Sequence, residues 1–194
     1  MLARSFKTLA VLLAVGVLPA DLAFAQQVSQ QRIISGLGKL KANAPAIDVE
    51  LLRQEAITGA GKQMSALPNW SKIAKLPQMV VEINFENDSV AIQPVSYRTL
   101  GMIADALHHP NLWAYKFLVI GHASSTGDAK HNLDLSEQRA VAIKEVLATT
   151  FAVDPQRLYA VGVGEAFPIE GTKTDAANNR RVQLVNLGVF TRKQ

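Results

Sequence analysis

A polar segment bounded by two glycines, Gly121–Gly127, contains the residues whose types first suggest chemistry. His122 and Ser124 lie two residues apart within it, and a serine hydrolase uses these residue types as base and nucleophile. No Gly-x-Ser-x-Gly turn surrounds the serine, and two neighbours on one loop do not make a catalytic triad. The segment also lacks the lysine of a phosphate-binding loop, so it does not predict a nucleotide site.

The spacing of the histidines and the absence of cysteine argue against further kinds of catalytic and metal site. The chain contains four His, at positions 108, 109, 122 and 131, and no pair of them has the i, i+4 spacing with a Glu that a helical zinc enzyme requires. It contains no Cys, which removes a thiol nucleophile, a disulfide framework and the acylated N-terminal Cys of a bacterial lipoprotein. We therefore predict a protein that is not an enzyme and that uses no metal and no cofactor.

Composition predicts a globular protein without affinity for nucleic acid. Of the 194 residues, 48% are hydrophobic and 19% are charged, which is enough apolar material to form a core. The formal charge is +4, and the basic residues are dispersed along the chain. A nucleic-acid-binding domain has a stronger and more clustered positive charge.

Residues 1–25 have the pattern of a secretory signal peptide. Arg4 and Lys7 precede an uncharged run from Leu9 to Leu18, and Ala23-Phe24-Ala25 places small residues before a predicted cleavage site. A retained membrane anchor is the alternative, but the run is shorter than the roughly 20 residues that span a bilayer. No later segment is long and uncharged enough to do so, and we expect a mature periplasmic chain with no transmembrane span.

Residues 26–77 contain two short amphipathic patterns interrupted by Gly and Pro. A helical stripe begins at Ile33, and residues 48–58 predict a second helix with Asp48 as its N-cap. Neither is long enough to be stable alone. The segment is therefore either a flexible tether whose helices rest on a surface part of the time or a binding segment for an envelope protein partner.

From residue 78 the pattern becomes regular. Alternation predicts a strand over 79–85, the apolar run 117–120 predicts a short buried strand, and further strands are predicted over 158–163 and 182–187. Periodicity of 3.6 residues predicts helices over 94–107 and 136–149. The resulting order β-α-β-α-β-β predicts an α/β fold, an α+β sandwich with helices packed on one face of a mixed sheet. We assign residues 78–188 to this domain and 189–194 to a C-terminal tail.

Five stretches of this region carry a family resemblance: VEINFENDSVAIQP, LHHP, FLVIGHASSTGDAKHNLDLSEQRA, RLYAVGVGE and NNRRVQLVN. In this order and spacing they resemble the OmpA-like peptidoglycan-binding domain, which also occurs in the MotB and Pal families. The resemblance implies an outer-membrane or cell-envelope protein that binds the diaminopimelate residue of the cell-wall peptide without a covalent bond. The transmembrane barrel of the name-giving protein does not fit into residues 26–77.

The resemblance also assigns a site. Diaminopimelate ends in an ammonium beside a carboxylate, so a selective site needs an anion and a bidentate cation. The family's arginine corresponds to Arg139, whereas the usual Gly-His-Thr-Asp reads Gly121-His122-Ala123-Ser124 here, and Ser124 replaces the aspartate. A hydroxyl supplies no charge, and the loss costs about 1.5–3 kcal/mol. Asp128, four residues on, is a candidate substitute.

Two further positions complete the predicted site. Asn132 either contacts the ligand through its amide, holds the loop, or closes a turn before the helix. Arg180 and Arg181 precede the last strand, where alternation predicts that one of them approaches the site, and we favour Arg180. The sequence thus predicts peptidoglycan binding by Ser124, Arg139, Asn132, Asp128 and Arg180. The alternative is an OmpA-like protein-interaction module that has lost the cell-wall ligand.

Overall fold

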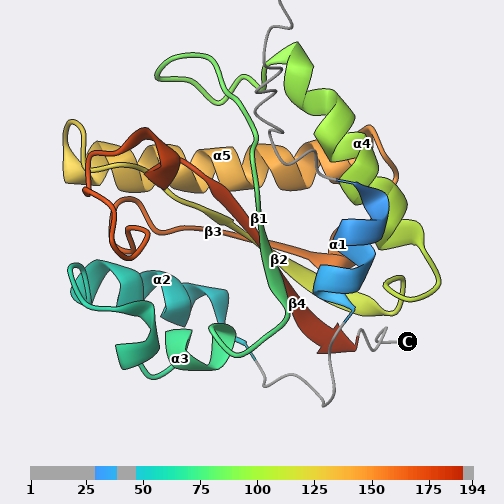
Figure 1. Ribbon diagram of the computed structural model, residues 1–194, viewed down its shortest axis with the longest axis horizontal. Coiled ribbons are helices and arrows are strands. Elements are labelled where there is room, and N and C mark those ends of the chain that lie inside the picture. Colours follow the sequence, from blue (N-terminus) through green and yellow to red (C-terminus); the bar gives the residue numbers. More distant parts are fainter. Residues whose placement is uncertain (1–28, 39–46, 190–194) are drawn as a thin grey trace, which may run out of the picture.

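The computed structural model describes residues 29–38 and 47–189. Its centre is a four-stranded mixed sheet with the order β1-β4-β2-β3, formed by β1 (Gln78–Val81), β2 (Tyr115–Gly121), β3 (Leu158–Gly162) and β4 (Val182–Val189). β2 pairs in parallel with β3 and antiparallel with β4, and β4 pairs antiparallel with β1. The strands cross the middle of the molecule in Figure 1. The predicted mixed sheet and the β-α-β-α-β-β order are confirmed.

Two long helices lie between the strands in the chain. α4 (Pro94–His108) has Pro94 in its first turn, where the missing N–H costs nothing. α5 (Ala129–Thr149) begins seven residues before the predicted Ser136, because the Asp128 carboxylate caps it by accepting the backbone N–H of His131 at 2.9 Å. Both helices contribute to one hydrophobic core on one face of the sheet.

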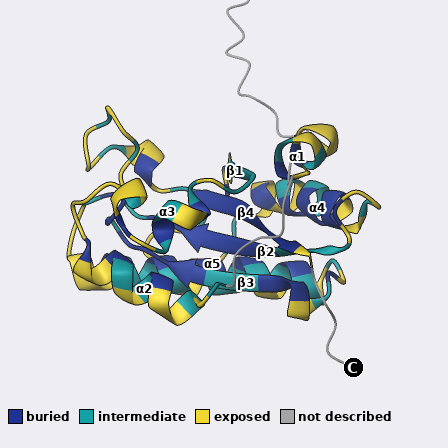
Figure 2. Ribbon diagram, turned by 90° about the horizontal axis from the view of Figure 1, so that it is seen from below, coloured by how far each residue is buried: buried dark blue, intermediate teal, exposed yellow. Residues whose placement is uncertain are grey.

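The opposite face of the sheet is also covered, which the sequence analysis did not predict. Side chains alternate along β2, so that Phe117 belongs to the core beneath α4 and α5 and Leu118 belongs to a second core. α2 (Val49–Thr58) and α3 (Trp70–Ile73) close this second core. Figure 2 shows β2 and β4 mainly in the colour of buried residues, as expected for strands covered on both faces.

The helices before residue 78 are therefore packed parts of the fold in the described residues. α1 (Gln30–Leu37) buries Ile33 and Leu37 in the first core, and α2 buries Leu52 and Ala56 in the second. The predicted N-cap of α2 is confirmed, because the Asp48 carboxylate accepts the backbone N–H of Leu51 at 3.1 Å. Because these segments share cores with the sheet, the chain has no packing boundary at residue 78. The domain division itself stays a prediction.

Three short 3-10 helices complete the fold: η1 (Met64–Ala66), η2 (Pro155–Arg157) and η3 (Ala177–Asn179). The first strand is shorter than predicted, ending at Val81, and Phe85 forms only an isolated bridge with Ile92. No helix within residues 29–38 and 47–189 is long and apolar enough to span a membrane. The predicted signal peptide and residues 190–194 of the predicted tail lie outside the described residues.

Candidate ligand-binding site

One edge of the sheet brings together ends of all four strands. Val182 at the start of β4 is aligned with Val81 at the end of β1 and with Gly121 at the end of β2, and Gly121 is aligned with Gly162 at the end of β3. The segments that leave β1, β2 and β3 and the segment that enters β4 therefore meet at this edge. This convergence places residues far apart in the sequence around one site.

Two glycines allow α5 to approach this edge closely. A side chain on Gly121 would collide with the carbonyl of Ser136, and one on Gly162 would collide with the backbone of Glu137. Gly164 has a positive φ of 53° and donates its N–H to the Ser136 hydroxyl at 2.8 Å. Gly121 and Gly162 thus serve the backbone geometry, and this contact brings Arg139, one turn further along α5, to the site.

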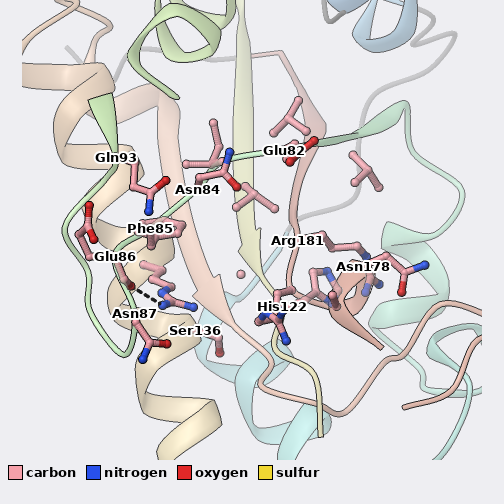
Figure 3. Close-up of a pocket in the computed structure, with 18 of the residues that line it drawn as sticks. Glu82, Asn84, Phe85, Glu86, Asn87, Gln93, His122, Ser136, Asn178 and Arg181 are labelled. Carbon is pink, nitrogen blue, oxygen red and sulfur yellow. Dashed lines mark hydrogen bonds between the residues drawn. The ribbon is translucent and has the colours of Figure 1, made fainter. Parts of the chain in front are cut away.

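A cleft of about 760 Å³ lies at this edge. Figure 3 shows Phe85, Glu86 and Asn87 on one side of it, Asn178 and Arg181 on the other, and His122 between them. Three guanidinium groups line the cleft, those of Arg139, Arg180 and Arg181. Of the predicted site residues, Arg139 and Arg180 thus line the same cleft, whereas Ser124, Asp128 and Asn132 do not.

Arg139 is fixed in the cleft by the segment that follows β1. Its Nε donates to the Ser89 carbonyl at 2.9 Å, its Nη2 contacts the Glu86 carbonyl at 3.4 Å, and its guanidinium lies 4.8 Å from the centre of the Phe85 ring. Burial lowers its pKa, Asp88 raises it and Arg180 lowers it. A guanidinium has five N–H donors, so this one keeps donors for a ligand in an orientation that its neighbours fix.

Arg180 and Arg181 both line the cleft, which corrects the prediction that only one of them approaches the site. Strand alternation does not apply to them, because β4 begins only at Val182. Arg180 donates to the Ser124 hydroxyl at 3.1 Å. Arg181 donates to the Phe167 carbonyl at 3.0 Å, and burial lowers its pKa to about 10, so it stays cationic at neutral pH.

Ser124 is buried and lies behind the cleft. Its hydroxyl is 3.0 Å from that of Thr126 and accepts the hydrogen bond from Arg180. Asn132 donates through Nδ2 to the carbonyls of Ser124 and Thr126, at 3.2 and 3.1 Å, and to the Glu165 carboxylate at 2.8 Å. Among the roles predicted for Asn132, the geometry favours holding the loop.

Two carboxylates lie near this loop, and only one of them, Asp128, was predicted to take part in the site. Asp128 is exposed and caps α5, so in this structure it does not replace the missing aspartate. Glu165 is tied to this loop, because Asn132 bonds both to it and to the Ser124 carbonyl. Sequence reasoning missed Glu165 as a site neighbour. The parallel pairing of β2 and β3 could have indicated it, since residues following parallel strands meet at one edge.

His122 was also missed as a residue of the cleft. It is only 4% exposed, and its Nε2 lies 3.0 Å from Oε1 of Gln183. Burial lowers the pKa of His122 to about 3, and the positive charge of Arg181 acts in the same direction. The ring is therefore neutral at physiological pH.

The cleft has a positive electrostatic character. Within the described part of the chain, none of its three arginines forms an ion pair, and they bond instead to carbonyl and hydroxyl oxygens. Glu82 and Glu86 also line the cleft, but both are exposed. The described residues contain no cluster of three or more His, Asp or Glu that would suit a metal ion. The arrangement is suited to binding an anion such as a carboxylate.

Comparison with known proteins identifies the domain. A family model described as the OmpA family matches residues 84–181. The chain is 34% identical over 114 residues to outer membrane porin F of Pseudomonas fluorescens, covering 57% of this chain and 34% of the porin. It is 31% identical over 106 residues to outer membrane protein A of Bordetella avium, covering 54% and 53%. The chain thus spans between about a third and a half of the length of these relatives.

A solved structure is similar as well. The peptidoglycan-associated lipoprotein from Burkholderia pseudomallei is 27% identical, with a TM-score of 0.44, over 58% of this chain and 91% of that one.

Proposed function

The chain belongs to the OmpA family, and we propose that it binds peptidoglycan non-covalently in the periplasm through the cleft at the sheet edge. In this proposal the Arg139 guanidinium binds the free carboxylate of the diaminopimelate side chain. The protein performs no catalysis and acts as a binding module of the cell envelope.

The position of Arg139 is the observation that carries this proposal. The family resemblance assigns the ligand's carboxylate to this residue, and the guanidinium lines a cleft in which it forms no ion pair with a carboxylate of the described residues. Contacts with Phe85 and with two backbone carbonyls hold it in one orientation. Preorganisation of this kind lowers the entropy lost when a ligand binds.

Of the other predicted site residues, Arg180 lines the cleft, and Asn132, Ser124 and Asp128 lie outside its lining. Asn132 ties the loop of Ser124 to Glu165, and Arg180 links that loop to the cleft wall through its bond to the Ser124 hydroxyl. Asp128 stabilises the start of α5. Ser124 offers no charge to a ligand ammonium, so we expect weaker binding of diaminopimelate than an aspartate at this position would give.

The envelope partner predicted for residues 26–77 remains a prediction. The burial of Leu52 and Ala56 against the sheet removes these side chains from any such contact, while Leu51 and Ile57 of α2 stay exposed. Single exposed apolar residues are common on protein surfaces, so they do not favour this function over ligand binding.

Co-sedimentation with purified sacculi tests the proposal. The wild-type protein should sediment with the sacculi and be released by free diaminopimelate, whereas Arg139→Ala should remain in the supernatant. Arg98→Ala is the matched control, because Arg98 is exposed on α4 and does not line the cleft. Equal sedimentation of wild type and Arg139→Ala, or no sedimentation of the wild type, would contradict the proposal.

A further inference from the structure

Arg180 brings to the cleft a positive charge that no carboxylate of the described residues neutralises. It is exposed and lines the cleft, and its Nη1 donates to the Ser124 hydroxyl at 3.1 Å. Neither of the ion pairs within residues 29–38 and 47–189 includes it. A guanidinium has five N–H donors, so Arg180 keeps donors for a ligand that enters the cleft from solvent.

The backbone that carries Arg180 is fixed by bonds outside the cleft. Its N–H donates to the Ala177 carbonyl at 3.0 Å, at the end of η3. The preceding Asn179 is fully buried, and its side chain accepts the Ile169 N–H and donates to the Lys173 carbonyl, both at 2.8 Å. These bonds hold the backbone of Arg180 in position before any ligand binds, which lowers the cost of binding.

Arg139 and Arg180 affect each other through their charges. Burial lowers the pKa of Arg139, Asp88 raises it, and the positive charge of Arg180 lowers it again. Two cations that line one cleft repel each other, and an anion bound to each of them offsets this repulsion. A ligand with a carboxylate for each guanidinium therefore gains more than a ligand with a single carboxylate.

The other charges of the cleft favour an anionic ligand over a zwitterion. Among the described residues, three arginines and two glutamates line the cleft and the buried His122 is neutral, so the lining has one excess positive charge. A zwitterion leaves this excess unchanged, whereas a second carboxylate on the ligand cancels it. Ser124 stands where the family has an aspartate, so an ammonium beside Arg180 meets a cation without the anion that would offset it.

We propose that the cleft selects a ligand with two carboxylates, the first bound by Arg139 and the second by Arg180. This inference rests on the proposed function and specifies the form of the ligand. In a stem peptide whose diaminopimelate side-chain carboxylate binds Arg139, the second carboxylate has two sources. One is the α-carboxylate of the preceding D-glutamate, and the other is the C-terminal carboxylate of an uncross-linked stem.

Calorimetric titration of the wild-type protein with synthetic stem tetrapeptides tests this selection. All peptides keep the amine and the carboxylate of the diaminopimelate side chain. In the reference peptide, the D-glutamate α-carboxylate and the C-terminal carboxylate are both amidated. One arm restores the D-glutamate carboxylate, and the other restores the C-terminal carboxylate, so the two sources are tested separately.

We expect at least one arm to bind about tenfold more tightly than the reference. Arg180→Gln should remove this gain, so that the arm and the reference bind alike. Arg98→Gln is the matched control and should keep the gain, because Arg98 is exposed on α4 and does not line the cleft. NMR of the arginine Nε–H groups in the wild-type protein needs no variant, and the arm should shift the Arg180 signal more than the reference does.

Several results would overturn the inference. Equal or weaker binding of both arms would remove the preference for a second carboxylate while leaving peptidoglycan binding intact. Retention of the gain in Arg180→Gln, or an Arg180 signal that the arm leaves unshifted, would assign the second carboxylate to another residue. Failure of every peptide to bind would overturn the proposed function together with this inference.

Discussion

The two faces of the sheet differ from the edge that carries the cleft in whether their side chains have partners within the chain. Both faces are closed by helices, and large residues such as Trp70 and Phe117 are fully buried there. At the edge, within the part of the chain that the structure describes, three arginines form no ion pair and a buried histidine nitrogen lacks a hydrogen bond. The comparison indicates that the faces supply stability, whereas the edge keeps groups that a ligand can satisfy.

The largest expected effect is on the face covered by α2 and α3. Trp70 is fully buried, donates to the Leu52 carbonyl at 2.8 Å and contacts Phe167 edge to face with ring centres 5.1 Å apart. Trp70→Ala should lower the free energy of unfolding by about 3–5 kcal/mol, measured by urea denaturation. A loss below about 1 kcal/mol would mean that these helices are not part of the cooperative fold.

The second expected effect is a pH dependence of the folding stability that is caused by the buried, neutral ring of His122. Its pKa falls from 6.5 to about 3 on folding, so the unfolded chain binds the extra proton between these values. The stability contributed by the neutral ring is complete above pH 6.5 and decreases as the pH falls toward 3, by up to about 1.4 kcal/mol per pH unit. His122→Phe should flatten this dependence, measured by denaturation at several pH values. Identical slopes for both proteins would contradict the buried neutral state.

A smaller loss of stability is expected in the loop behind the cleft. Asn132→Ala removes the donor shared by the carbonyls of Ser124 and Thr126 and the carboxylate of Glu165. We expect a destabilisation of about 1–3 kcal/mol and faster amide exchange in residues 121–128. The exposed Asn111→Ala serves as a control. Unchanged exchange in the loop would show that Asn132 does not hold it.

The smallest effect concerns the missing anion. Ser124→Asp places a carboxylate beside Arg180 and restores the residue type that the family has at this position. It should tighten binding of a peptide with a free diaminopimelate amine by about tenfold, or 1.4 kcal/mol. Ser125→Asp, on the same loop, is the control. An equal gain from both variants would point to a general effect of added charge.

The sequence predicted the elements well where periodicity alone decides them. The helix from Pro94 and the strand around 117–120 follow directly from local patterns. The cover on the second face was missed, although four consecutive apolar residues, Phe117–Ile120, are typical of a strand that is buried on both sides. The two short helices that provide this cover, α2 and α3, depend on tertiary contacts for their stability, which local patterns do not report.

The candidate site was predicted only in part for a similar reason. Arg139 follows from the family motif, and the structure places it in the cleft. The positions of His122, Glu165 and Arg181 depend on the strand order and on which strand ends share an edge, which one sequence does not specify. Asp128 was expected near the ligand because of its spacing from Ser124, but the start of α5 uses its carboxylate as a cap.

The most direct test of ligand binding at the edge is calorimetric titration of the wild-type protein with a diaminopimelate-containing muropeptide, compared with Arg139→Ala. The account predicts measurable binding by the wild type and a loss of about 10- to 100-fold in Arg139→Ala, as expected for a charged hydrogen bond. Arg98→Ala should bind as the wild type does. Equal affinities for wild type and Arg139→Ala would contradict the assignment of the cleft as the binding site.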